Sequence, residues 1–316
     1  MSLNPKRVLF LDSVHPVLEQ ELTAMGFVCI HEYQANRTEV SNYISDYQGI
    51  VLRSRLIIDA EILKNANQLE FILRSGSGME NIDVEYAKSK NIACFNSPEG
   101  NADAVGEHTI GLMLSLLNKI TIANLQVKNG IWKREENRGL ELKSRCVGLL
   151  GYGHMGKAVA KRLQSFGCDT LFMDPLQETD AHAKKAQEKE FFEKVEILSL
   201  HTNYLASNFH LVDHAFIQRM KNSFILINTA RGKIVNTEAL IKALDSGKII
   251  AAGLDVNEFE NHNFQHDAGT FHPLLQKLSE YPQVIITPHV AGWTTESYFK
   301  LSAVLAEKVK SLYQKK

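Results

Sequence analysis

Short apolar runs rich in β-branched and aromatic residues alternate with helix-like stretches along this chain of 316 residues. This alternation constrains the fold more than any other feature. The first runs lie at 7–12, 27–30, 49–54, 69–75 and 92–97. A second series begins at CVGLLG (146–151) and continues through DTLFMD, EILSLH, FILINTA, IAAGLDV and QVIITPH. Strands that alternate with helices are typical of βαβ units, which build a parallel sheet covered by helices. The sequence therefore predicts an α/β protein with two parallel-sheet domains that divide near residue 100.

Composition and charge exclude several classes of protein. Apolar residues make up 44% of the chain, which is enough for a large core and excludes a disordered protein. The net charge of −1 gives no indication of a nucleic-acid or membrane-surface partner. The four cysteines form no C-x-x-C pair and no metal-ligand spacing, which is typical of a reduced protein. The N-terminal apolar run is too short for a signal peptide, so we expect a cytoplasmic location. Because no metal-ligand spacing occurs, we expect no bound metal.

Two long stretches have helical periodicity. Residues 102–128 are so apolar that we expect one helix, buried between two units. The last stretch, from residue 294 to 316, predicts an amphipathic helix that closes the chain.

A glycine-rich turn follows the strand-like run CVGLL. Gly151, Gly153 and Gly156 form G-x-G-x-x-G, and a helix-like segment follows them. The first glycine permits a tight turn, the second lets the backbone approach a pyrophosphate, and the third permits close packing of helix on strand. The helix N-terminus then presents free N–H groups to the phosphates.

An acidic residue at the end of the next strand-like run strengthens this interpretation. Asp174 ends TLFMD and can accept hydrogen bonds from both ribose hydroxyls of adenosine. Its charge would repel a 2′-phosphate, which favours NAD over NADP. The alternative is a strand–glycine–helix turn that binds no ligand, but the strand, helix and acid together favour a dinucleotide.

Three stretches farther along the chain contain polar residues at the ends of strand-like runs: INTARGKIVN (227–236), GLDVNEFE (253–260) and ITPHVAGWT (286–294). With the glycine turn, this ordered set resembles the D-isomer-specific 2-hydroxyacid dehydrogenases. The resemblance implies two Rossmann-like domains. A flavodoxin-like substrate domain would comprise 1–100 and 290–316, and an NAD-binding Rossmann domain would comprise 101–289.

The chemistry of such an enzyme needs a proton donor or acceptor and a group that holds a carboxylate. His289 suits the proton step, and a carboxylate at Glu260 would orient its ring and stabilise its protonated form. Arg231 offers a planar fork for a carboxylate or a polarised carbonyl. The family's Arg, Glu and His match these three positions. Alone, each has a simpler interpretation, as a surface arginine, a solvated acid or a structural histidine.

One departure bears on the glutamate. The family usually has proline after it, whereas Asn261 here opens a polar stretch, 261–273. Glu258 is the competing acid, although its spacing from Asp255 does not match the family pattern.

The resemblance assigns further residues to NAD. They are His154 and Met155 in the glycine turn, His201 and Thr202 in LHTNYL (where Asn203 replaces a proline), Thr229, Ala230 and Arg231, Asp255, and His289 with Ala291 and Gly292.

The first domain contains candidate substrate residues, which would act with Arg231 and His289. Backbone N–H groups around Ser77 and Gly78, in RSGSGMENID (74–83), can hold a carboxylate. Arg53 and Arg55 stand two apart at the end of a strand-like run, so we expect both on one face, as a phosphate site. Asn101 lies at a predicted helix start.

These features resemble family members that oxidise 3-phospho-D-glycerate to 3-phosphohydroxypyruvate in serine biosynthesis. The alternatives are that both arginines only brace the domain, that the chain reduces glyoxylate or hydroxypyruvate, or that it is a non-catalytic NAD-sensing binding protein. The resemblance also implies a homodimer that acts on a small-molecule acid.

Overall fold

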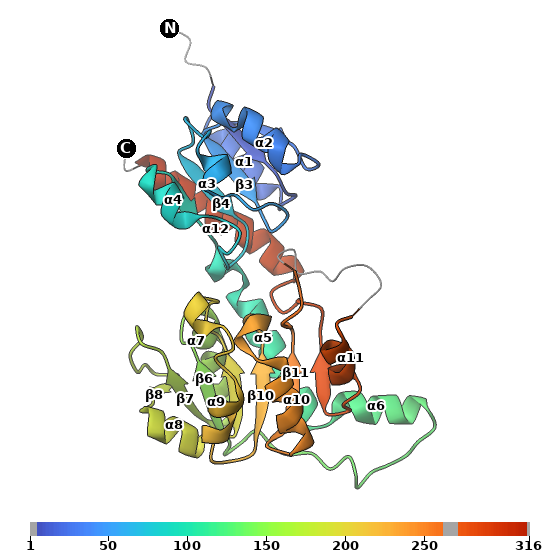
Figure 1. Cartoon of the computed structure of the whole chain (residues 1–316). Helices are drawn as coiled ribbons and strands as arrows, with labels where there is room; N and C mark the ends of the chain where they lie inside the picture. The colour runs from blue at the N-terminus through green and yellow to red at the C-terminus, as the bar shows by residue number, and fades with distance from the viewer. Residues whose placement is uncertain (1–4, 262–270, 315–316) are drawn as a thin grey trace. The chain divides into compact units, whose positions relative to one another are not determined.

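The computed structural model describes residues 5–261 and 271–314, so most of the polar stretch 261–273 lies outside the described residues. The chain divides into two compact units (Figure 1). Unit 1 comprises Met1–Asn101 and Trp293–Lys316, and unit 2 comprises Ala102–Gly292. Both chain ends therefore contribute to unit 1, and unit 2 is inserted between them. The sequence predicted the boundaries between the two units at 100/101 and 289/290, and the units divide at 101/102 and 292/293.

Unit 1 contains a parallel sheet in the order β2-β1-β3-β4-β5. This order is that of flavodoxin-like folds, and it confirms the predicted fold class of the unit. Each strand coincides with one of the apolar runs of the first part of the sequence. The strands are β1 (Arg7–Phe10), β2 (Val28–His31), β3 (Gly49–Leu52), β4 (Phe71–Arg74) and β5 (Ala93–Phe95).

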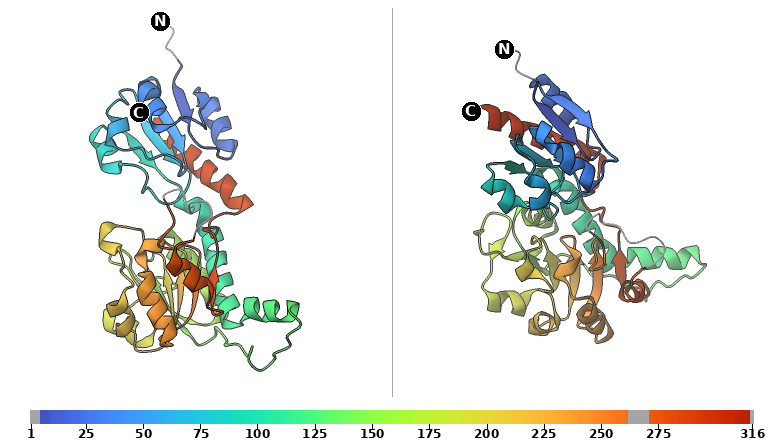
Figure 2. Two further views of the ribbon diagram at one scale, coloured as in Figure 1. Left: turned by 45° about the vertical axis from the view of Figure 1, so that its right-hand side comes forward. Right: turned by 45° about the horizontal axis from the view of Figure 1, so that its top comes forward.

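Helices cover both faces of this sheet (Figure 2). In β1, Val8 packs on the same side as α1 and α12, whereas Leu9 packs on the side of α2, α3 and α4. A strand buried on both faces reads as a continuous apolar run, which explains the sequence VLFL. The helices are α1 (Val17–Ala24), α2 (Arg37–Tyr43), α3 (Ala60–Leu63), α4 (Val84–Ser89) and α12 (Thr295–Gln314), with a 3-10 turn η1 (Ile44–Asp46).

Unit 2 contains a parallel sheet in the order β12-β11-β10-β9-β6-β7-β8. Counted from β6, six of these strands follow the order 3-2-1-4-5-6 of dinucleotide-binding Rossmann folds, and β12 adds one strand beyond β11. The predicted Rossmann fold is thus confirmed. The strands are β6 (Cys146–Leu150), β7 (Asp169–Met173), β8 (Lys184–Lys185), β9 (Ile197–Leu200), β10 (Phe224–Asn228), β11 (Ile249–Leu254) and β12 (Val284–Ile286).

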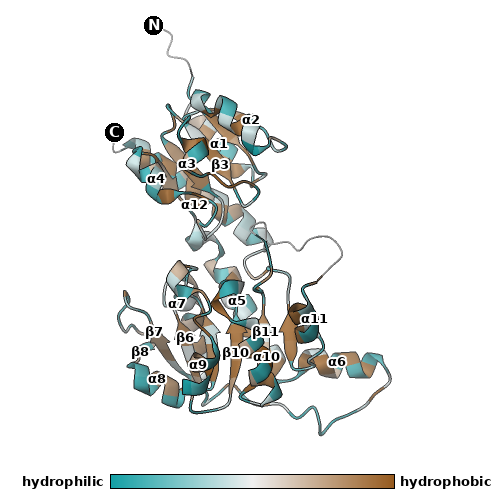
Figure 3. Cartoon of the chain, in the orientation of Figure 1, coloured by the Kyte–Doolittle hydropathy of each residue, from teal (hydrophilic) through white to brown (hydrophobic). Residues whose placement is uncertain are grey.

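Two apolar cores lie on the two faces of the unit 2 sheet. One is formed with α5 and α7, and the other with α8, α9, α10 and α11. Colouring by hydropathy shows the apolar strands between these helices (Figure 3). The helices are α5 (Pro98–Leu117), α6 (Ile120–Lys128), α7 (His154–Leu163), α8 (Glu188–Lys194), α9 (His214–Arg219), α10 (Thr237–Asp245) and α11 (Pro273–Ser279). Three 3-10 turns also occur: η2 (Gln164–Phe166), η3 (Ala206–Asn208) and η4 (Gly232–Ile234).

The expectation of one buried helix over 102–128 is wrong. The segment forms α5 and α6, which are bent by 61° where Lys119 adopts a left-handed backbone conformation. The α6 helix has no buried residue, and Leu125 is 60% exposed. In the described ranges no single helix is long and apolar enough to cross a membrane. The bent α5–α6 pair taken together has a sufficient length and apolar composition, and those are the two properties it shares with a membrane span.

Candidate active site

The glycine turn joins β6 to α7, and each glycine has a distinct local reason. Gly151 has φ +95°, and a Cβ there would lie 2.7 Å from the carbonyl carbon of His201. At Gly156 a Cβ would lie 2.4 Å from the Gly151 carbonyl oxygen, so only glycine allows α7 to approach the strand this closely. Gly153 is the N-cap of α7, no side chain caps the helix, and the space beside its Cα is open. This exposed cradle fits a pyrophosphate group.

His154 and Met155 are the first residues of α7, where backbone N–H groups have no partner within the helix. They therefore face the same opening as Gly153. The positive end of the helix dipole adds to the attraction for an anion there.

Asp174 follows β7 directly and is fastened to the glycine turn. Its Oδ2 accepts a hydrogen bond from the Tyr152 N–H (2.8 Å), and its Oδ1 accepts one from the Leu176 N–H (2.8 Å). A carboxylate has about four acceptor positions, so two remain for the hydroxyls of a ribose. The geometry fits the role predicted from its place after the second strand.

His201 and Thr202 follow β9 beside the glycine turn. The His201 Nε2 lies 2.8 Å from Ser199 Oγ, and its buried Nδ1 has no hydrogen-bond partner in the described part of the chain. Burial lowers the pKa of His201 to about 3, so the ring is neutral. Asn203, which replaces the family's proline, has its carbonyl bonded to Asn208 Nδ2 (2.8 Å), and this bond shapes the loop after Thr202.

Thr229, Ala230 and Arg231 form the turn that follows β10. The side chain of Asn228 fixes this turn, because its Oδ1 accepts from the Ala230 N–H (3.0 Å) and its Nδ2 donates to the Arg231 carbonyl (3.0 Å). Thr229 is tied to α5 by a hydroxyl pair with Thr109 at 3.0 Å. Arg231 is partly buried, and its Nη1 donates to the Ala230 carbonyl (2.7 Å).

Asp255 is a buried carboxylate that organises the segment carrying His289. It accepts hydrogen bonds from Thr287 Oγ1 (2.5 Å), the Val290 N–H (2.9 Å) and the Ala291 N–H (2.8 Å). Three donors leave one of about four acceptor positions, on Oδ2, unused by these bonds. Ala291 is buried, and Gly292 ends unit 2 directly after it.

Glu260 and His289 form a pair whose Oε2 and Nδ1 atoms are 2.8 Å apart. The carboxylate accepts, so Nδ1 carries a proton and Nε2 is left to exchange one with a substrate. The Asn257 N–H holds the other carboxylate oxygen (3.3 Å). His289 itself has φ +54°, a conformation that costs free energy in a residue other than glycine and often occurs at functional sites. An oriented imidazole of this kind can act as a general acid or base.

The competing acid has a separate partner. Glu258 Oε1 lies 2.7 Å from His210 Nε2. Burial raises the pKa of Glu258, but hydrogen bonds from Thr237 and His210 outweigh burial, and the net shift is downward. The acid that pairs with His289 is therefore Glu260 and not Glu258.

In unit 1, the phosphate site at Arg53 and Arg55 stays a prediction, and the two side chains have different surroundings. β3 ends at Leu52, so the two-residue alternation of a strand does not extend to Arg53 and Arg55. The Arg55 guanidinium donates to the carbonyls of Leu11 (2.8 Å) and Ala35 (2.7 Å), which gives it the bracing role. It also forms an ion pair with Asp12 at 3.3 Å.

Arg53 differs from Arg55. Its guanidinium lies over the ring of Trp293 (4.1 Å to the centroid), a cation–π contact, and it has no hydrogen bond to another described residue. Burial lowers the pKa of Arg53, partly offset by Asp12. A half-buried guanidinium with unused donors is suited to bind an anion.

The other candidate substrate residues lie together in unit 1. Ser77 Oγ donates to Asn101 Oδ1 (2.7 Å), which joins the loop after β4 to the first turns of α5. Gly78 is buried directly after Ser77. A Cβ at Gly76 would lie 1.5 Å from Arg74 Nη1, so the Arg74 guanidinium covers this loop.

Several residues around the site were not predicted. His108 Nε2 lies 3.1 Å from Thr287 Oγ1 and 3.6 Å from Asp255 Oδ1. Trp293 contacts Arg53, and His210 contacts the competing acid Glu258, each across a long sequence separation, whereas Arg74 covers the loop just before Ser77. Arg74 lies in the quoted RSGSGMENID motif and Trp293 in the quoted ITPHVAGWT motif, so these two had a sequence signal that could have found them.

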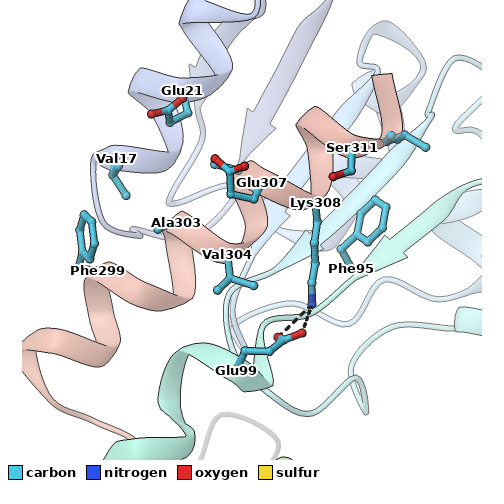
Figure 4. A pocket seen from close by; sticks show the side chains of 12 residues that line it. Val17, Glu21, Phe95, Glu99, Phe299, Ala303, Val304, Glu307, Lys308 and Ser311 are labelled. Carbon is cyan, nitrogen blue, oxygen red and sulfur yellow. Dashed lines mark hydrogen bonds and ion pairs between the residues drawn. The ribbon is translucent and has the colours of Figure 1, made fainter. Parts of the chain in front are cut away.

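A cavity of about 630 Å³ in unit 1 is distinct from these residues. It lies between α1, the start of α5 and α12, and Lys308 pairs with Glu99 at 2.9 Å inside it (Figure 4). None of the predicted site residues lines it. Among the described residues, no group of three or more His, Cys, Asp or Glu side chains is arranged to hold a metal ion.

Comparison with known proteins identifies the family. The model of the "D-isomer specific 2-hydroxyacid dehydrogenase, NAD binding domain" family matches residues 110–291. The chain belongs to the D-isomer-specific 2-hydroxyacid dehydrogenases. The matched segment lies within unit 2 and includes the glycine turn and His289, so the cofactor of this family, NAD, fits the cradle described above.

Members of this dehydrogenase family with several activities resemble the chain. It is 34% identical to hydroxypyruvate reductase of Thermotoga maritima over 274 residues, which are 86% of this chain and 87% of that protein. It is 33% identical to D-3-phosphoglycerate dehydrogenase of Archaeoglobus fulgidus over 278 residues, 87% of this chain and 51% of that protein. The chain thus spans about half the length of that relative. The structure of Aquifex aeolicus D-lactate dehydrogenase, complexed with NAD and lactic acid, matches with a TM-score of 0.83 and 25% identity, covering 98% of this chain and 96% of that one.

Proposed function

We propose that the chain catalyses NAD-dependent interconversion of a D-2-hydroxy acid and its 2-oxo acid. The observation that carries the proposal is the 2.8 Å contact between His289 and Glu260 in a family member with an open glycine cradle. NAD, when bound, supplies or accepts the hydride. The cradle at Gly153, with the first N–H groups of α7, would hold its pyrophosphate, and Asp174 would hold its ribose.

The protein's own residues would manage the proton and the carboxylate. During reduction, the His289 Nε2–H donates a proton to the C2 oxygen, while Glu260 keeps the opposite nitrogen hydrogen-bonded. During oxidation, the neutral Nε2 accepts that proton. Arg231 binds the carboxylate or polarises the C2 carbonyl with its planar guanidinium. The imidazole of His289 and the guanidinium of Arg231 stabilise developing charge on the substrate most strongly where water is excluded.

Within this class we propose 3-phospho-D-glycerate as the substrate, oxidised to 3-phosphohydroxypyruvate. Arg53 would bind the phosphate, because its guanidinium is half-buried and its donors are unused by described residues. Ser77, Gly78 and Asn101 would contact the carboxylate. The similarity to D-3-phosphoglycerate dehydrogenases supports this proposal, and the similarity to hydroxypyruvate reductase supports an unphosphorylated acid as the second candidate.

The test is NADH consumption with phosphohydroxypyruvate, hydroxypyruvate, glyoxylate and pyruvate, measured on the wild type and on Arg53→Ala. Arg53→Ala removes the hydrogen bonds that the guanidinium would donate to the phosphate. We expect KM for phosphohydroxypyruvate to rise about 10- to 100-fold and KM for hydroxypyruvate to stay nearly unchanged. Arg53→Lys retains the charge and is the matched control, and we expect it to lose less. Equal KM increases for both acids would refute a phosphate role for Arg53. Retained NADH binding without turnover on any acid would favour the NAD-sensing alternative.

We also propose a homodimer formed through α6 and the segment after it. This arm projects from the rest of unit 2 (Figure 2), and it exposes Leu125 (60%), Val127 (52%) and Trp132 (82%). An exposed apolar surface of this kind is typical of an interface between protein chains. Sedimentation equilibrium tests the assembly, and a monomeric mass at micromolar concentration would contradict it.

A further inference from the structure

His210 occupies an unusual backbone position between η3 and α9. Its φ is +52°, a left-handed conformation that residues other than glycine rarely adopt. Its backbone N–H donates to the Lys233 carbonyl (2.9 Å), in the η4 turn that begins directly after Arg231. The main chain at His210 is thus bonded to the turn that carries the candidate carboxylate clamp.

The neighbours of the His210 imidazole determine which ring nitrogen carries the hydrogen of the neutral ring. Asn236 caps α10, and its Oδ1 accepts from the Ala239 N–H (2.8 Å). This contact turns its amide NH₂ toward His210, where Nδ2 lies 3.0 Å from Nδ1. The Nδ1 atom must therefore be an acceptor, so the hydrogen of the neutral ring is on Nε2. The Nε2–H donates to Glu258 Oε1 at 2.7 Å.

Glu258 connects this ring to the loop that carries Glu260. Its second oxygen accepts from the Thr237 N–H (3.0 Å) at the start of α10. The loop lies directly on η4, because a Cβ at Gly232 would lie 1.8 Å from the Asn257 carbonyl oxygen. The Asn257 N–H in turn holds Glu260 Oε1. The His210–Glu258 pair therefore connects the turn after Arg231, the start of α10 and the loop 257–260 to one another.

We propose that His210 is a positioning residue for this dehydrogenase: through its Nε2–H it holds the 257–260 loop against η4, so that Glu260 stays on His289. Nothing in the proton transfer itself requires His210. The inference rests on the catalytic assignment of Glu260 and His289 made above.

The experiment compares His210→Ala with the wild type in the reduction of the best 2-oxo acid by NADH. We expect kcat to fall about tenfold, since small displacements of catalytic groups have effects of that order or larger. KM for NADH stays unchanged. The pH at which the reduction rate falls to half moves lower, because a displaced Glu260 stabilises the protonated imidazole less. His210→Gln, whose amide can again donate to Glu258, recovers most of kcat.

Two controls separate a positioning role from loss of fold. His214→Ala makes the same replacement at an exposed histidine four residues away, and it leaves kcat and the pH profile as in the wild type. If His210→Ala does not fold, His210→Asn carries the test, because asparagine tolerates the left-handed backbone but is too short to reach Glu258. A kcat and pH midpoint equal to the wild type in His210→Ala or His210→Asn would overturn the inference.

The failure of the proposed function would look different. In that case the wild type itself would lack turnover, or His289→Asn would keep full activity, whatever the His210 variants do.

Discussion

Replacing Asp255 by asparagine tests how the His289 segment is held. Asp255 is 1% exposed, and all three groups bonded to it are donors: Thr287 Oγ1, the Val290 N–H and the Ala291 N–H. A carboxylate accepts at both oxygens, but an amide accepts at only one. Because two of the donors share Oδ1, the amide oxygen of the variant takes that position. Its NH₂ then faces the buried Ala291 N–H.

The expected loss of stability follows from these contacts. An unsatisfied buried donor costs about 1–3 kcal/mol, and a hydrogen bond to a charged acceptor is worth about 1 kcal/mol more than one to a neutral acceptor. One orphaned donor and two weakened bonds together lower the free energy of unfolding by about 3–5 kcal/mol. The loss falls on the strand end that carries His289, so we also expect kcat to decrease in Asp255→Asn.

Urea unfolding followed by far-ultraviolet circular dichroism measures this loss. Asp213→Asn is the matched control, because Asp213 caps α9 by accepting from the Phe216 N–H (2.8 Å), and asparagine caps a helix equally well. We expect a change of at most about 0.5 kcal/mol there. A loss of less than about 1 kcal/mol in Asp255→Asn would refute the argument that its two oxygens hold the segment.

Two further predictions concern the cofactor cradle and acid stability. Gly153→Ala keeps the wild-type melting temperature but weakens NADH binding, measured by fluorescence titration, because its Cβ enters open space needed by the pyrophosphate; Gly156→Ala also lowers the melting temperature. Unchanged NADH affinity in Gly153→Ala would contradict the cradle. Burial lowers the pKa of His201 to about 3, so between the unfolded value of 6.5 and about 3 the unfolded state binds one more proton. Stability therefore falls by about 1.4 kcal/mol per pH unit as the pH drops through that range, and His201→Asn removes this part of the slope in urea titrations at several pH values. Parallel slopes for both proteins would show that His201 titrates normally.

Local pattern was sufficient to predict the glycine turn and every strand except the two-residue β8 (Lys184–Lys185). A strand buried on both faces needs a continuous apolar run, and the run CVGLL therefore predicts β6 without further information. The same kind of reasoning failed at the α5–α6 junction. Ile120 and Leu125 continue the apolar character of the preceding helix, yet the left-handed backbone at Lys119 redirects the chain and leaves both side chains exposed. A single residue's backbone conformation has no signature in the periodicity around it.

The contacts of Arg53 and Arg55 could not be read from the sequence for a different reason. Arg55 is held by the carbonyls of Leu11 and Ala35, and these backbone groups exist at that position only after β1 and β3 have paired. Any residue type can supply a carbonyl, so the sequence carries no trace of this partner. Trp293, which stacks on Arg53, comes from the far end of the chain, so local pattern could not predict the contact between them.

The two acids of NEFE show what the assembled structure adds. Sequence spacing favoured Glu260 but left Glu258 as a competitor, because spacing alone does not show which histidine each acid contacts. In the structure each takes its own histidine, and the two pairs are only two residues apart on one loop. A loop anchored at both acids cannot shift at one without straining the other. The second pair therefore constrains the first, and the position of the general acid depends on a histidine, His210, that lies 79 positions before it in the chain.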